Sequence, residues 1–161
     1  MKIPAEKIMK LAGCILLCNL AGIISFLSTA LSTRVWYRLL LRPVFAPSVW
    51  AYPSIWILFC TIMGISLWLV LEKGVKTRAA VTAVTIFLIQ LTFNCLWLVV
   101  FFKLHLIFPA LMLIGALVAF IIMNIILFYK ISKLAAFILL PYLAWMIFVA
   151  IMNSVLFIYN G

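Results

Sequence analysis

Five long stretches without a charged residue alternate with short charged segments along the chain. They cover residues 11–33, 43–71, 79–102, 104–129 and 134–161. Each exceeds the roughly 20 residues that an α-helix needs to cross the hydrocarbon core of a bilayer. The pattern predicts an all-α integral membrane protein, a single domain of residues 1–161 with five transmembrane helices in one bundle. We expect the helices at about 9–31, 48–71, 79–102, 106–129 and 134–158, with a loop at about 32–47.

Polar and aromatic side chains recur at helical spacing within two of the predicted helices. In the third helix, Gln90, Asn94 and Trp97 fall within about 60° of one another. The corresponding group in the fifth helix comprises Tyr142, Trp145, Val149 and Asn153, within about 80°. An unpaired polar group in lipid costs several kcal/mol, so both stripes should face protein, water or a ligand. We expect the two stripes to meet across a pocket inside the bundle.

The charged residues are few and lie at the ends of the predicted helices. Lys and Arg total 12 against two acidic residues, which gives a formal charge of +10. One side would carry Lys2, Lys7, Lys10, Lys73, Lys76, Arg78, Lys130 and Lys133, and the other Arg34, Arg38, Arg42 and Lys103. Lys and Arg side chains at helix ends typically reach the membrane interface and determine the topology. This explains the positive charge without a nucleic-acid partner, so we expect none. The positive-inside rule favours an N-terminus inside the cell, and we expect a prokaryotic cell membrane.

The predicted loop at 32–47 is the longest connection. Arg34, Arg38 and Arg42 recur every four residues, so a short helix would place them on one face. Such a segment can anchor the chain at the membrane interface. It can also form a lid over the pocket mouth, where Arg side chains would pair with acidic groups of a ligand. Both roles can hold at once.

The sequence contains no conventional catalytic or metal-binding constellation. It has no Asp, and Glu6 and Glu72 lie at helix ends. The cysteines, which lie within predicted helices and should behave as small apolar residues, are Cys14, Cys18, Cys60 and Cys95. His105, the only histidine, lies at a helix end, where an interfacial position is favoured over haem ligation or proton transfer. We therefore predict no catalytic residues, no metal site and no required cofactor.

Three blocks of residues make the chain recognisable. The first contains Trp36, Tyr37, Leu40, Arg42, Pro43, Phe45, Pro47, Trp50, Trp56, Met63 and Gly64; the second contains Leu88, Gln90, Leu91, Phe93, Asn94, Trp97, Phe101 and Phe102; the third contains Leu140, Pro141, Tyr142, Leu143, Trp145, Phe148, Met152 and Asn153. With these blocks, the chain resembles the translocator protein family, also called tryptophan-rich sensory proteins or TspO/MBR, over nearly its whole length. It departs from the family where Pro47 is followed by Ser48 rather than by a second Pro. Nothing charged follows Tyr159, so the sterol motif of the animal relatives is incomplete.

The resemblance implies a five-helix bundle, commonly homodimeric, with a pocket between helices that the first loop closes. Gly115, Ala116 and Ala119 form a pattern of small residues that suits a helix contact or a dimer seam. Relatives bind porphyrins such as protoporphyrin IX and haem, synthetic benzodiazepine-type and isoquinoline ligands and, in animals, cholesterol. Some bacterial relatives are reported to degrade protoporphyrin in light.

By motif, the resemblance places ligand-binding residues throughout the predicted pocket and loop. They are Trp36, Tyr37, Trp50, Trp56, Gln90, Asn94, Trp97, Tyr142, Trp145 and Asn153, with Arg34, Arg38 or Arg42 available to the propionates of a porphyrin. The expected function is that of a membrane receptor or carrier for tetrapyrroles and other flat hydrophobic ligands, in sensing, transport or scavenging. The alternatives are a light- and oxygen-dependent porphyrin-degrading enzyme and a lipid- or sterol-binding membrane protein.

Overall fold

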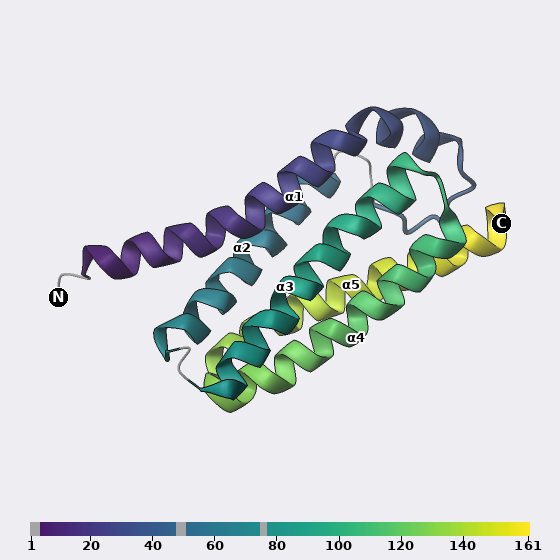
Figure 1. Ribbon diagram of the computed structural model, residues 1–161. Coiled ribbons are helices and arrows are strands. Elements are labelled where there is room, and N and C mark those ends of the chain that lie inside the picture. The colour runs from purple at the N-terminus through teal and green to yellow at the C-terminus, as the bar shows by residue number, and fades with distance from the viewer. Residues whose placement is uncertain (1–3, 48–50, 75–76) are drawn as a thin grey trace.

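The computed structural model is a bundle of five long helices (Figure 1). It describes residues 4–47, 51–74 and 77–161, with all side chains in these ranges except those at 26, 28–34, 51 and 52. The elements are α1 (Ala5–Leu39), α2 (Ala51–Glu72), α3 (Arg78–Leu98), the π-helix η1 (Val99–Lys103), α4 (Ile107–Ile131) and α5 (Lys133–Asn160). All five α-helices are long and apolar enough to cross a membrane, and the described residues form no strand. The predicted all-α membrane fold is confirmed.

The first helix differs most from its predicted bounds. We expected a helix over about 9–31 and a loop over 32–47, but α1 continues to Leu39. No Gly or Pro interrupts the chain between Gly22 and Leu39, so nothing ends the helix sooner. The helix ends shortly before Pro43, because a proline disfavours helical backbone at the preceding residue. Only the second half of the expected loop is therefore non-helical.

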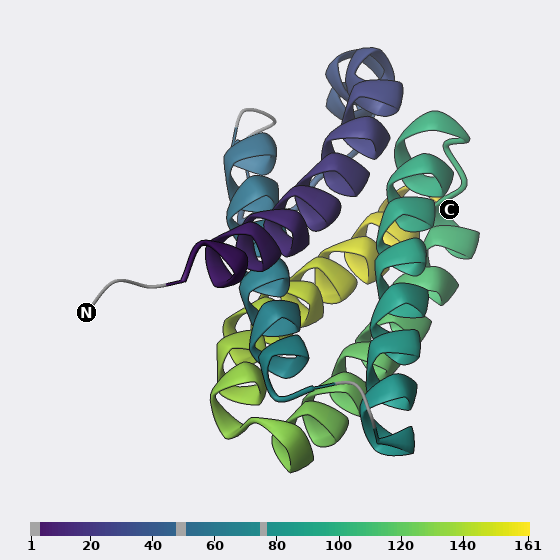
Figure 2. The ribbon, with the colours of Figure 1, turned by 60° about the vertical axis from the view of Figure 1, so that its left-hand side comes forward.

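The five helices pack in a ring (Figure 2). α1 packs on α2, α2 on α5, α5 on α4 and α4 on α3, and α3 together with η1 returns to α1. Although α2 directly precedes α3 in the chain, the two helices make few contacts. The start of α1 and the end of α5 lie at opposite ends of the bundle, as an odd number of crossings requires. The direction in which the chain sits in the membrane stays a prediction.

Small residues bring α1 and α2 close together. A Cβ atom at Gly64 would lie 2.6 Å from the Cα atom of Ile15 and 2.9 Å from the Cys14 carbonyl oxygen. A Cβ atom at Gly22 would lie 2.7 Å from Cys60 Sγ. Helices in a membrane gain little from hydrophobic burial against each other, so close backbone approach supplies much of their packing energy. The two glycines fix the α1–α2 crossing at two points.

The π-helical turn η1 extends α3 toward the end of the bundle. The Leu104 backbone N–H donates to the carbonyl oxygen of Val99, five residues back, at 3.0 Å. Phe101 and Phe102 of this turn are both buried. The turn thus presents two neighbouring aromatic rings to the interior.

Candidate functional site

The polar stripes of α3 and α5 meet inside the bundle. Asn94 Nδ2 donates a hydrogen bond of 2.6 Å to Tyr142 Oη, and both side chains are buried. Gln90 turns instead toward α4, where Asn124 Nδ2 donates to Gln90 Oε1 at 2.7 Å. Within the described part of the chain, one hydrogen bond therefore joins the two stripes, and the second carboxamide of α3 belongs to the α3–α4 interface.

Aromatic rings extend from this region in two stacks, one on α3 and one on α5. In the α3 stack, Trp56 of α2 lies 6.0 Å from Trp97, which lies 5.5 Å from Phe101, with all three rings nearly parallel. In the α5 stack, Phe59 of α2 lies 5.8 Å from Trp145, which lies 5.3 Å from Phe148. These centroid distances are those that aromatic pairs prefer. α2 thus contributes one ring to each stack.

Side chains from α2, α3 and α5 enclose the space between the stacks. We call them the inner cluster: Trp56, Phe59, Cys60, Met63, Asn94, Tyr142 and Trp145. The space they enclose has no room for a water molecule. Pockets that hold drug-sized ligands measure roughly 300–1,000 Å³. The open pocket expected between the stripes is therefore absent from this part of the described chain, because rings and the Met63 side chain from α2 fill it.

Sequence reasoning missed part of this cluster. Trp56 was among the predicted ligand-binding residues, but Phe59 and Met63 were not, and Cys60 was expected to behave only as a small apolar residue. All four line the enclosed space. Their spacing of three, four and seven residues from Trp56 places them on one helix face, and that signal could have found them.

Many polar atoms on Trp56 and on the inward stripes of α3 and α5 are buried without a hydrogen-bond partner among the described residues. They are Nε1 of Trp56, Trp97 and Trp145, Nε2 of Gln90, Oδ1 of Asn94, and Nδ2 and Oδ1 of Asn153. Each unpaired buried group costs about 1–3 kcal/mol, and the large majority of buried side-chain polar atoms in proteins are paired. These atoms leave hydrogen-bonding capacity unused within the described part of the chain.

The predicted residues near the end of α1 lie outside the inner cluster. Tyr37 is buried, and its hydroxyl lies 3.7 Å from Met152 Sδ of α5. Trp36 stacks on His105 with ring centroids 4.4 Å apart. Arg38 and Arg42 are exposed, and the Arg42 guanidinium lies 5.2 Å from the centre of the Tyr37 ring. The Arg34 side chain and all of Trp50 fall outside the described residues.

The connection after α1 is fastened to the end of α5. The Leu41 N–H donates to Asn160 Oδ1 at 2.9 Å, and Asn160 Nδ2 donates to the Leu41 carbonyl at 3.0 Å. Phe45 lies 6.1 Å from Phe148, edge to face. The connection therefore covers the outer end of the α5 stack, in the position of a lid.

The fold and the buried residues define the class of membrane protein to which the chain belongs. The protein is a helical membrane protein with five spanning segments around a buried cluster rich in tryptophan and carboxamide side chains. The TspO/MBR family model matches residues 14–158, so the chain belongs to this family. The resemblance drawn from the three blocks of residues is confirmed.

Individual relatives match over most of their length. The chain is 34% identical over 154 residues to the tryptophan-rich protein TspO of Archaeoglobus fulgidus, covering 96% of this chain and 99% of the relative. It is 32% identical over 148 residues to the tryptophan-rich protein TspO of Chlorobaculum tepidum, covering 92% and 94%. It is 32% identical over 123 residues to the translocator protein of Homo sapiens, covering 73% and 70%.

Proposed function

We propose that the protein binds tetrapyrroles such as protoporphyrin IX or haem, and other flat hydrophobic molecules, at the inner cluster. In this function it is a membrane receptor or carrier. The observation that supports the proposal best is the group of unpaired indole N–H and carboxamide atoms beside two stacks of aromatic rings. Stacked indoles offer faces to a flat macrocycle, and the unpaired atoms offer hydrogen bonds to its edge.

Binding requires the inner cluster to open, because the space it encloses is too small for any ligand. The interior is held largely by contacts between rings, such as the Trp56–Trp97 stack. A flat aromatic ligand inserted between two rings replaces one stacking contact by two of the same kind. Since α2 makes few contacts with α3, the α2 side chains can separate from α3 without breaking an extensive helix interface.

The polar edge of the ligand would lie toward the end of the bundle that carries the connection after α1. Arg38 and Arg42 are exposed at this end, where the propionates of a partly buried porphyrin would reach water. Charge-assisted pairs between guanidinium and carboxylate groups are among the strongest hydrogen bonds in proteins. The aromatic face of the macrocycle then lies among the indoles and its acidic edge beside the arginines.

Titration of the protein in lipid nanodiscs with protoporphyrin IX tests this proposal. Saturable quenching of tryptophan emission is expected, and the Kd should rise about three- to tenfold in Trp145→Phe and in Asn94→Leu, which remove a stacking indole and an amide. Trp68→Phe is the matched control, because Trp68 is a partly buried tryptophan of α2 that does not line the inner cluster. The absence of saturable quenching in the unmodified protein, or an equal rise of the Kd in Trp68→Phe, contradicts the proposal.

A further inference from the structure

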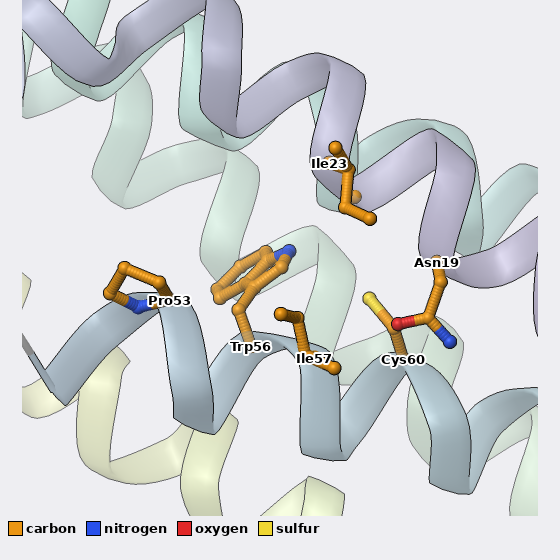
Figure 3. Close-up of a pocket in the computed structure, with 7 residues that line it drawn as sticks. Asn19, Ile23, Pro53, Trp56, Ile57 and Cys60 are labelled. Carbon is orange, nitrogen blue, oxygen red and sulfur yellow. The ribbon is translucent and has the colours of Figure 1, made fainter.

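A second hollow lies between α1 and α2 on the outside of the bundle (Figure 3). It is lined by Asn19, Gly22, Ile23, Pro53, Trp56, Ile57 and Cys60, and we call it the α1–α2 crevice. Its volume is about 30 Å³, and about 10–15 Å³ is enough to hold one water molecule. Ile23 and Ile57 are exposed at its rim. Because both belong to membrane-spanning segments, the crevice opens toward lipid.

Two side chains separate this crevice from the inner cluster. Trp56 and Cys60 line the crevice on one side and the enclosed space between the aromatic stacks on the other. Both are buried. A molecule that moved inward from the crevice would therefore meet the inner cluster after displacing the Trp56 ring.

No hydrogen bond to a described residue holds the Trp56 ring in place. Its Nε1 atom is buried and has no hydrogen-bond partner among the described residues, and Figure 3 shows this nitrogen turned toward α1. The residue it faces is Gly22, where a Cβ atom would lie 3.2 Å from the indole nitrogen. Turning the ring thus breaks packing contacts only, and Gly22 presents no side chain to the ring. Asn19 Oδ1, which is also unpaired among the described residues, offers an acceptor in the same crevice.

We propose that the α1–α2 crevice is a lateral portal through which a flat apolar molecule dissolved in the bilayer reaches the inner cluster, with the Trp56 side chain as its movable wall. The inference rests on the proposed function. A ligand of this class concentrates in the bilayer, and the portal faces it there. The alternative path past the connection after α1 is obstructed by the pair of hydrogen bonds between Leu41 and Asn160.

The portal can be tested by covering its rim. Ile57→Trp places a larger side chain at the mouth, and Leu58→Trp is the matched control, since Leu58 is similarly exposed, 56% against 49%, and does not line the crevice. Association and dissociation of protoporphyrin IX are measured in nanodiscs by stopped flow, through the emission of the porphyrin. In Ile57→Trp both rate constants are expected to fall about tenfold while the Kd stays unchanged, because a barrier is added outside the bound state. Leu58→Trp should keep both rates.

Each other outcome has a defined meaning. If the unmodified protein shows no saturable binding at equilibrium, the proposed function fails. If it binds and Ile57→Trp keeps both rates, or slows them no more than Leu58→Trp does, the portal is refuted. A higher Kd caused by faster dissociation alone also refutes it, because Ile57 would then contact the bound ligand. Ile23→Trp, with Ile24→Trp as its control, repeats the test from α1 should the first variant fold poorly.

Discussion

Replacing Asn153 by leucine should stabilise the protein when no ligand is bound. The Asn153 side chain is 0% exposed, and neither its Nδ2 nor its Oδ1 has a hydrogen-bond partner among the described residues. Leaving a buried amide unpaired costs about 1–3 kcal/mol. Leucine has a similar shape and no polar atom, so the free energy of unfolding should rise by about 1–3 kcal/mol.

Asn124→Leu is the matched control for this substitution. Asn124 is also 0% exposed, but its Nδ2 donates to Gln90 Oε1 at 2.7 Å. Its removal leaves the whole Gln90 amide unpaired, so the free energy of unfolding should fall by about 0.6–1.7 kcal/mol, the range of hydrogen bonds between membrane helices. Unfolding by SDS in mixed micelles, followed by tryptophan emission, measures both variants. A loss of stability in Asn153→Leu as large as that in Asn124→Leu would refute the reasoning, because the Asn153 amide would then be bonded within the fold.

The same variant links stability to binding. If the unpaired Asn153 amide serves the ligand, Asn153→Leu should bind protoporphyrin IX more weakly while unfolding less readily. Opposite changes of this kind are common where a binding site keeps a group that the fold alone does not need.

Three further substitutions test helix packing and the hydrogen bond between α3 and α5. Gly64→Ala should lower the free energy of unfolding by about 1–3 kcal/mol through overpacking, since its Cβ atom would lie 2.6 Å from the Cα atom of Ile15. Gly115→Ala, with no atom within 4 Å of the added Cβ, should raise the free energy of unfolding by up to about 1 kcal/mol. The same SDS assay compares the two glycine variants. Tyr142→Phe removes the acceptor of the 2.6 Å hydrogen bond from Asn94, so the free energy of unfolding should fall by about 0.6–1.7 kcal/mol. An unchanged free energy of unfolding would show that this bond adds no stability.

The sequence predicted the helices well because bilayer thickness, rather than long-range contacts, determines the length of each apolar run. Helical spacing also predicted which side chains turn inward, and the bond between Asn94 and Tyr142 joins the two stripes as expected. The partner of Gln90 was not predicted, since it bonds to Asn124 of α4. Periodicity defines the face of one helix, whereas the partner depends on how each helix is rotated against its neighbours.

Two features of the fold could not be predicted from the sequence pattern, and the reasons are physical. The apolar run predicted the part of α1 within the membrane, but a helix without Gly or Pro can continue past the bilayer, here to Leu39. The closed interior depends on the distance between helices and on how Phe59 and Met63 fill the gap. Neither quantity follows from spacing along the chain.

The π-helical turn at Val99–Lys103 affects how the length of related chains can vary. Such a turn holds a hydrogen bond across five residues, one more than an α-helix uses. Deleting one residue here lets the backbone relax to ordinary helical bonding, and the helices on either side keep their orientation. A deletion in α4 before Asn124 would instead rotate that side chain by about 100°, out of the interior and toward lipid. A deletion of one residue should therefore be tolerated at this turn and disruptive in α4.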